Sequence, residues 1–261
     1  MRWGNDRCEY SMTNNPTENN GVKKFLVDHK LDMPDLFRTY DYDGDYYVDG
    51  FPKRFDLEQK IIKAAKQNSF DKEHLLMIAD WGHLRNKKPV EEIDHAIKIT
   101  LYINGEPVNW LKDKPENIIR DVENIPGFRV TFSSKLLHFA IPQIFGILDT
   151  WLVRTFGEGD PAHQRYKFLK LKVTNPKGGW RIPTTQPSWP AEFGAWIRIL
   201  SYIADQLNKE KILCPHPSKF IEAGLRKDGI WYPADVESAL FCYAYEGRGV
   251  KIIRALQYDR K

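Results

Sequence analysis

Apolar residues recur at intervals of three and four positions along most of this chain, and this spacing restricts its fold more than any other feature. The clearest example is 191–208, AEFGAWIRILSYIADQLN, in which Phe193, Trp196 and Leu200 fall on one side of a helix. Strands do not alternate with helices in the pattern, so the sequence predicts an all-α fold. The same spacing predicts further helices over 21–31, 56–67, 71–81, 89–105, 114–125, the stretch after Gly127, and 233–247.

Length and composition favour one folded domain. Of 261 residues, 42% are hydrophobic, which suits a globular protein. Residues 1–20 are rich in Asn and Thr and lack apolar periodicity, so we expect a disordered tail followed by a single domain over 21–261. No apolar run is long enough to span a membrane, and the first residues lack the apolar stretch of a signal peptide. The widely spaced Cys8, Cys214 and Cys242 indicate a reducing compartment, so we expect a cytoplasmic protein.

The charge and the aromatic content permit a nucleic-acid partner. The chain has a net charge of +4 and contains 8 Trp, 12 Tyr and 14 Phe. Rings close to Arg and Lys suit nucleic acid, because bases stack on rings while cations contact phosphates. On composition alone, rings that fill a core remain the simpler interpretation.

An acidic segment, DYDGDYYVDG, invites a calcium-loop interpretation and fails on spacing. Asp41, Asp43 and Asp45 occupy alternate positions, as calcium ligands do. An EF-hand also needs a glycine at its sixth position and a glutamate at its twelfth, where this chain has Tyr46 and Pro52. The segment therefore predicts an acidic surface loop.

A second short motif, CPHP, places Cys214 close to His216. Structural zinc sites need a second pair of ligands, and none stands nearby in the sequence, so we expect no metal. The glycine-rich loops that bind nucleotide phosphates are also missing from the sequence.

The stretch 125–139, IPGFRVTFSSKLLHF, places a Pro-Gly turn between two predicted helices. Backbone amides at such a turn can bind a phosphate without using side chains. A plain helical hairpin is the alternative interpretation. Shortly afterwards the run FGILDT, 145–150, carries one carboxylate, Asp149, in otherwise apolar surroundings.

The turn, the apolar helix and Asp149 together resemble the helix-hairpin-helix DNA glycosylases. In that superfamily a Leu-Pro-Gly hairpin leads, after an apolar helix, to a turn that ends in the catalytic aspartate. The resemblance implies an all-α fold with two helical subdomains and a cleft between them. It also implies that 115–156 forms the hairpin and catalytic segment, and that helices within 190–250 return to pack beside the N-terminal helices.

The chain departs from the superfamily pattern at two positions. Arg129 stands where the hairpin usually has a second glycine, and Thr131 stands where bifunctional members have a Schiff-base lysine. Monofunctional members also have a hydroxyl residue there, so the resemblance implies a monofunctional enzyme in which Asp149 is the catalytic carboxylate. Lys135 lies one helical turn further on, and a Schiff base on this lysine is the alternative.

The resemblance also assigns the remaining site residues. The DNA-binding turn maps onto Gly127, Arg129, Thr131, Ser133 and Ser134. The pocket for a flipped base maps onto Glu237 and Phe241, and Trp151 is a further candidate because it stands two residues after Asp149. Core packing of the two rings and solvation of Glu237 are the alternatives. His138 is expected to be structural. A basic run adds candidate phosphate contacts but is more typical of a solvated face; it comprises Arg154, Arg165, Lys167, Lys170 and Lys172.

The expected function is therefore hydrolysis of the N-glycosidic bond of a damaged or modified base flipped out of double-stranded DNA. We expect a monomer that needs no cofactor and contacts no membrane. Three alternatives stay open: a bifunctional glycosylase and lyase, a DNA-binding domain without catalysis, and a protein-interaction domain. The sequence does not identify the base, so repair and defence against phage DNA are both consistent with it.

Overall fold

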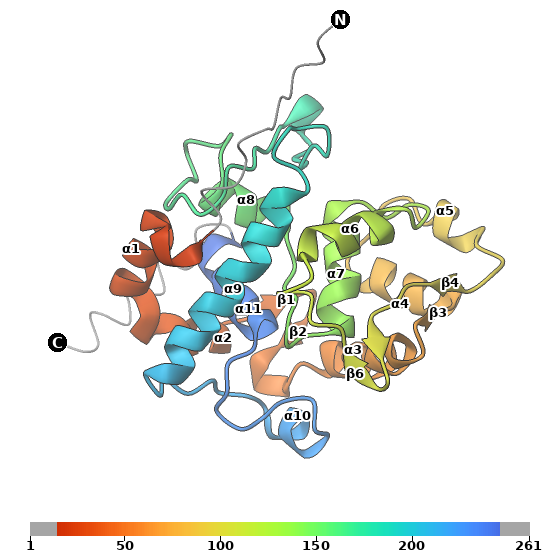
Figure 1. Cartoon of the computed structure of the whole chain (residues 1–261), viewed down its shortest axis with the longest axis horizontal. Helices are drawn as coiled ribbons and strands as arrows, with labels where there is room; N and C mark the ends of the chain where they lie inside the picture. Colours follow the sequence, from red (N-terminus) through yellow and green to blue (C-terminus); the bar gives the residue numbers. More distant parts are fainter. Residues whose placement is uncertain (1–14, 246–261) are drawn as a thin grey trace, which may run out of the picture.

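A computed structural model describes residues 15–245 of the chain (Figure 1). The α-helices are α1 (Asn20–His29), α2 (Met33–Arg38), α3 (Pro52–Lys66), α4 (Lys72–Trp81), α5 (Lys88–Glu91), α6 (Pro115–Glu123), α7 (Val130–Ala140), α8 (Thr150–Phe156), α9 (Ala191–Lys209), α10 (Ser218–Glu222) and α11 (Pro233–Ala244). The 3₁₀ turns are η1 (Pro16–Glu18), η2 (Lys30–Asp32), η3 (Tyr47–Asp49) and η4 (Pro176–Gly178). Six two-residue strands pair in three antiparallel ribbons: β1 (Asp41–Tyr42) with β2 (Asp45–Tyr46), β3 (Ser69–Phe70) with β4 (Ile97–Lys98), and β5 (Tyr102–Ile103) with β6 (Glu106–Pro107).

The described fold is mostly helical, as the apolar spacing predicts. Helix α9 buries Phe193, Trp196 and Leu200 along the predicted face. Helix α4 is capped by Asp71, whose side chain accepts a backbone N–H of the first turn while the His74 side chain accepts the Asp71 N–H. Capping of this kind satisfies donors that a helix start otherwise leaves free.

The helix predicted over 89–105 is wrong. Helix α5 ends at Glu91, and the chain continues into β4 and β5. Asn104 and Gly105 both have positive φ and form the two-residue turn between β5 and β6. An Asn-Gly pair favours this hairpin turn, and the β-branched residues before it favour strands, so turn chemistry outweighs the helical spacing.

The predicted tail over 1–20 is also partly wrong. Residues 1–14 lie outside the described part of the chain, but Pro16–Glu18 form η1 and Asn20 begins α1. The Asn19 side chain accepts the Val22 N–H at 3.1 Å and donates to the Phe168 carbonyl at 2.8 Å. These two bonds join the start of α1 to a distant segment, so the folded domain begins earlier than predicted.

The acidic segment that the sequence predicts as a surface loop has a structural role instead. Asp45 is fully buried, and its carboxylate accepts the N–H groups of Lys53 and Arg54 at 3.0 and 2.9 Å. Asp45 therefore caps α3, and the β1–β2 ribbon is held against that helix.

Two groups of helices can be followed in Figure 1. In one group α11 packs against α2, α8 and α9, so the C-terminal part of the described chain meets its N-terminal part. In the other, α7 packs against α3, α4 and α6. The hairpin helix α6 also contacts α9, and one continuous apolar core joins the two groups. Within residues 15–245 no helix has the length and apolar character needed to cross a bilayer.

Candidate functional site

The predicted hairpin is present as α6, a turn, and α7. Gly127 has a φ of +83°, a conformation that residues with a side chain rarely adopt, and a Cβ at this position would lie 3.3 Å from Val90 and 3.4 Å from Pro89. Gly127 and Arg129 are exposed and Thr131 is half-buried, so the turn presents its backbone and one cation to solvent.

Two residues assigned to DNA contact are not on this surface. Ser133 and Ser134 are fully buried within α7, so the expectation that they contact DNA is wrong. Ser134 has a different role, because its hydroxyl accepts the Leu148 N–H at 3.0 Å and donates to the Thr131 carbonyl at 3.0 Å. It joins the hairpin helix to the segment that ends at Asp149.

Asp149 is half-buried and caps α8, with its Oδ1 accepting the Leu152 N–H at 2.9 Å. Burial raises the pKa of this carboxyl, while the Leu152 N–H, the Lys135 ammonium and the Trp151 N–H oppose the rise. Bonds from the first turn of a helix fix the orientation of the side chain. A carboxylate held in this way is a preorganised negative charge.

Lys135 lies on α7 inside a cage of aromatic rings, and only 5% of it is exposed. Its Nζ is 4.9 Å from the ring centre of Trp81, 5.1 Å from Phe132 and 5.3 Å from Tyr42. Burial lowers the pKa of this amine to about 8, while the charges of Asp149 and Glu237 act in the opposite direction. A substantial neutral fraction is therefore present at mildly alkaline pH.

Gly82, which ends α4, leaves the space that the Lys135 amine occupies. A Cβ at this position would lie 2.7 Å from Lys135 Nζ and 2.7 Å from the Phe132 ring. Any side chain at position 82 would have to push the amine, the ring, or both out of place.

Glu237 lies deeper than the sequence predicts. Only 3% of Glu237 is exposed, and a Cβ placed on Gly146 would lie 2.7 Å from the Glu237 Cβ. Burial raises its pKa well above the usual range, and burial lowers that of the neighbouring His138, 3.4 Å away from Nδ1 to Oε2. Glu237 is not a solvated side chain, so that alternative is wrong. The buried position of His138 fits its expected structural role.

Phe241 and Trp151 meet through a third ring, Tyr245. The Tyr245 ring lies 5.1 Å from that of Phe241, nearly parallel to it, and 5.3 Å from that of Trp151. Phe241 also touches Tyr42. The two rings assigned to a base pocket therefore belong to one aromatic cluster that reaches the cage of Lys135.

Most of the predicted basic run forms contacts within the protein. The Arg154 Nε lies 2.6 Å from Asp160, and Lys167 and Lys172 lie 2.7 and 3.8 Å from the two oxygens of Glu158. Arg154 fits neither a phosphate contact nor a solvated face, because it is buried as well as paired.

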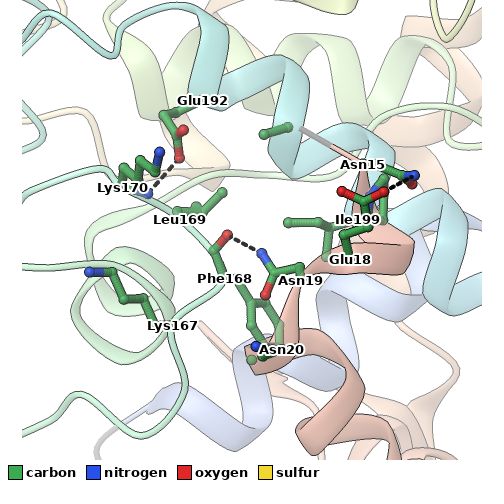
Figure 2. A pocket seen from close by; sticks show the side chains of 13 residues that line it. Asn15, Glu18, Asn19, Asn20, Lys167, Phe168, Leu169, Lys170, Glu192 and Ile199 are labelled. Carbon is green, nitrogen blue, oxygen red and sulfur yellow. Dashed lines mark hydrogen bonds between the residues drawn. The ribbon is translucent and has the colours of Figure 1, made fainter. Parts of the chain in front are cut away.

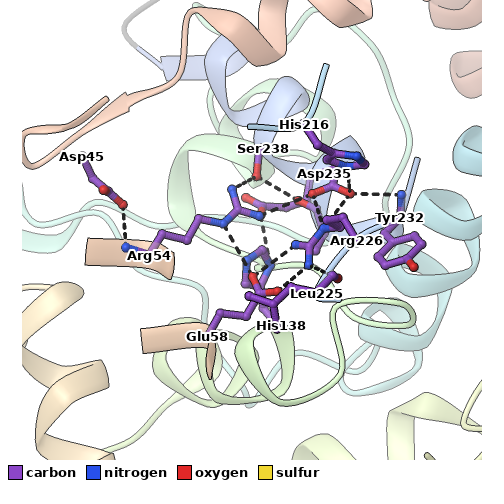
Figure 3. A network of polar contacts seen from close by, with 12 residues as sticks. Asp45, Arg54, Glu58, His138, His216, Leu225, Arg226, Tyr232, Asp235 and Ser238 are labelled. Atoms are coloured by element: carbon purple, nitrogen blue, oxygen red, sulfur yellow. Dashed lines mark hydrogen bonds and ion pairs between the residues drawn. The ribbon is translucent and has the colours of Figure 1, made fainter. Parts of the chain in front are cut away.

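A buried polar cluster centred on Arg226 lies beside His138 (Figure 3). Arg226 binds both carboxylate oxygens of Asp235 at 3.0 and 3.1 Å and also contacts Glu58. Burial acts to raise the pKa of Asp235, but the charges of Arg226, His216 and Arg54 hold it well below its usual range. The cluster fastens α3 to α11.

This cluster contains the described grouping with the spacing of metal ligands. Donor atoms of Cys214, His216 and Asp235 lie within 4.8 Å of one another. Both oxygens of Asp235 are bound by Arg226, and one also contacts His216 at 3.0 Å. A guanidinium in this place opposes a second cation, so the arrangement fits an ion pair and not a metal site.

A cavity of about 380 Å³ lies between η1, α1, α9 and the segment 167–170 (Figure 2). Lys170 donates its backbone N–H to the buried Glu192 at its wall. Lys167 and Lys170 of the basic run line it, whereas Asp149, Lys135 and the residues assigned to the turn and to the base pocket do not.

Sequence reasoning missed the aromatic cage. Tyr42, Trp81 and Gly82 come from segments far from the hairpin, and no local motif links them to Lys135. Phe132 could have been predicted as part of the cage, because it lies three residues before Lys135 on the same helix.

Comparison with family models, with curated proteins and with solved structures finds no match to this chain.

Proposed function

We propose that this protein is a DNA glycosylase that hydrolyses the N-glycosidic bond of a damaged or modified base, with Asp149 as the catalytic carboxylate. One observation carries the proposal: the Asp149 carboxylate is fixed at a helix start, and it and the caged Lys135 amine affect each other's pKa, on the two segments that follow an exposed Pro-Gly turn. Pairs of titratable groups with shifted pKa values are enriched at catalytic sites.

The chemistry follows from charge. Departure of the base leaves positive charge on the sugar, so a fixed carboxylate beside C1′ stabilises the transition state more than the ground state. Asp149 cannot rotate freely, since Leu152 holds one of its oxygens. The same carboxylate can orient or deprotonate the attacking water when it is ionised.

The turn between α6 and α7 would hold the DNA. Its exposed backbone at Gly127 and the Arg129 guanidinium offer donors to a phosphate, and α7 extends from this turn to Lys135. Ser134 then connects α7 to Leu148, next to Asp149. A phosphate held at the turn would therefore be fixed relative to the carboxylate through a short and rigid path.

A bifunctional enzyme is the second candidate, and the cage around Lys135 favours it. A nucleophilic amine must be neutral, and the pKa of about 8 supplies this form. The amine would displace the base at C1′ and lose a proton. Opening of the sugar ring at the C1′–O4′ bond, with a proton taken up by O4′, would give an iminium, and loss of a C2′ proton would then expel the 3′ phosphate. Borohydride trapping on DNA with an abasic site tests this route, with Lys135→Ala as the variant that should lose the adduct.

The test of the main proposal is excision by Asp149→Asn on a panel of duplexes with oxidised, alkylated, deaminated and enzymatically modified bases. We expect the natural protein to leave abasic sites in at least one duplex, and Asp149→Asn to leave none while its DNA affinity is retained. Asp56→Asn, an exposed aspartate on α3, is the matched control. Salt-dependent binding without abasic products would instead identify a DNA-binding domain, and no salt-dependent binding would leave the protein-interaction alternative.

A further inference from the structure

A short turn over 174–181, which contains η4, carries an aromatic ring and two cations beside the proposed active site. Its ends pair by two backbone hydrogen bonds of 2.9 Å between Thr174 and Arg181. Lys177 and Arg181 are exposed, and the sequence TNPKGGWR includes no acidic residue. This turn belongs to the loop-rich segment between α8 and α9, here called the insertion, to which the mechanism above assigns no role.

The ring of this turn, Trp180, is attached to the catalytic segment through Arg154. The Arg154 Cζ lies 4.4 Å from the ring centre of Trp180 and 4.2 Å from that of Trp151, which places the guanidinium between the two indoles. Asp160 neutralises Arg154 with a bond of 2.6 Å from Nε. Trp151 stands two residues after Asp149, so the stack begins in the first turn of α8.

We propose that the 174–181 turn binds DNA beside the flipped nucleotide. Trp180 would stack on the unpaired base that has lost its partner, and Lys177 and Arg181 would contact DNA phosphates. This inference rests on the proposed function. Arg154 is buried and paired, so its charge holds the ring and does not meet DNA. Trp180 is half-buried, which leaves part of the indole for a base.

The chemistry favours unpaired DNA over an intact duplex. A ring with neighbouring cations is the arrangement by which proteins hold unstacked bases, because every base has a face that can stack. A base that has lost its partner by flipping is already unpaired, so stacking on Trp180 costs no further base pair. The turn should therefore recognise the opened site and contribute little to binding of intact DNA.

The test uses a duplex with a tetrahydrofuran abasic analogue opposite 2-aminopurine, and an intact duplex of the same sequence. We expect Trp180→Ala to weaken binding of the abasic duplex at least about fivefold and to change binding of the intact duplex less than about twofold. Stacking on Trp180 in the natural protein should quench the 2-aminopurine fluorescence, and Trp180→Ala should restore it. Trp180→Phe should keep most of the affinity for the abasic duplex and most of the quenching of 2-aminopurine. Lys177→Ala should lower the slope of affinity against salt by about 0.9, while the exposed Lys66→Ala on α3 should not.

The outcomes separate this inference from the proposed function. If the natural protein prefers the abasic duplex and Trp180→Ala binds both duplexes with the same affinities as the natural protein, only the inference is overturned. Equal losses on both duplexes, or a loss that Trp180→Phe does not restore, would identify Trp180 as packing for the insertion and would also overturn it. If the natural protein binds neither duplex, the proposed function and the inference both fail.

Discussion

The Ser134 hydroxyl accepts the Leu148 N–H at 3.0 Å and so fixes the segment that leads to Asp149 against the hairpin helix. The two residues are fourteen positions apart in the chain, and both are fully buried. A hydrogen bond in such a place is hard to replace, because water cannot reach the N–H that would be left. The position of Asp149 thus depends on the helix that carries Lys135.

Ser134→Ala should reduce stability by about 1–3 kcal/mol, because it leaves the buried Leu148 N–H without its acceptor. Activity should fall further than stability alone explains, since the segment before Asp149 is no longer fixed. Urea denaturation and excision rates at a temperature where both proteins are folded would measure the two effects.

The neighbouring Ser133 is the matched control. It is equally buried on the same helix, but its hydroxyl has no hydrogen-bond partner among the described residues. Ser133→Ala should therefore be neutral or slightly stabilising. Equal losses for the two variants would show that the alanine, and not the lost bond to Leu148, is responsible.

Asp149→Asn should leave the protein as stable as before, or more stable, at pH 7. Burial raises the pKa of Asp149, so ionisation in the folded state is less favourable than in the unfolded state. Its contribution to stability is present below the unfolded pKa of about 4 and is lost as the pH rises through the raised folded value. Asn still accepts the Leu152 N–H as a cap. Thermal unfolding at pH 7 and pH 4 should show the advantage of the variant only at the higher pH.

Lys135→Met should stabilise the protein at pH 7 by about 1–2 kcal/mol. Lowering the pKa from 10.5 to about 8 corresponds to a cost of roughly 3 kcal/mol for the charged form, and attraction to the aromatic rings returns about 1–2 of this. Below pH 8 the folded and unfolded amines are both protonated, so the cost is constant. Between about pH 8 and 10.5 the unfolded state binds more protons, and stability of the natural protein rises with pH.

Denaturant unfolding from pH 7 to 10 measures this difference. The natural protein should approach Lys135→Met in stability as the pH rises. Borohydride trapping, if Lys135 is a nucleophile, should increase over the same range as the amine loses its proton. A natural protein that loses stability relative to the variant above pH 8 would show that the amine is not desolvated.

Gly82→Ala should affect Lys135 more than it affects folding. The new Cβ would meet the tip of the lysine and the edge of the Phe132 ring, both of which can move by a small amount. We expect a loss of stability of about 1–3 kcal/mol together with a change in the pH dependence of any Lys135-dependent reaction. The lysine pKa, measured by the pH dependence of chemical labelling, should shift back toward that of a free lysine. Unchanged labelling would mean that Gly82 does not set the position of the amine.

The parts of the site that are formed by residues close together in the sequence can be predicted, and those formed by distant segments cannot. The α6–α7 hairpin follows from the Pro-Gly turn and helical spacing, and the cap of α8 follows from Asp149 itself. Helix-hairpin order says nothing about the β1–β2 ribbon, where Tyr42 sits because Asp45 caps α3. Burial of Ser133 and Ser134 was missed because the resemblance assigns whole turns, while the two hydroxyls point into the packed side of α7.

The polar network in Figure 3 could not be predicted from the sequence either, because its residues are far apart along the chain. Glu58, Arg226 and Asp235 read as ordinary charged positions on predicted helices and loops, and only the fold brings them together. A charged residue is normally exposed, so burial of three of them requires mutual pairing that no local pattern reveals.

Glu58→Ala should be among the most destabilising single substitutions in the chain. It removes one carboxylate from Arg226, whose guanidinium is almost completely buried and would keep only Asp235 as an anionic partner. Breaking one side of a buried pair typically costs about 3–5 kcal/mol, because the remaining charge is desolvated without compensation. Lys30→Ala is the control, since its pair with Glu210 is partly exposed and should contribute less than about 1 kcal/mol. Urea unfolding of both variants would decide the matter: a small effect of Glu58→Ala would mean that water reaches Arg226, and the two helix groups would then not depend on this cluster for their connection.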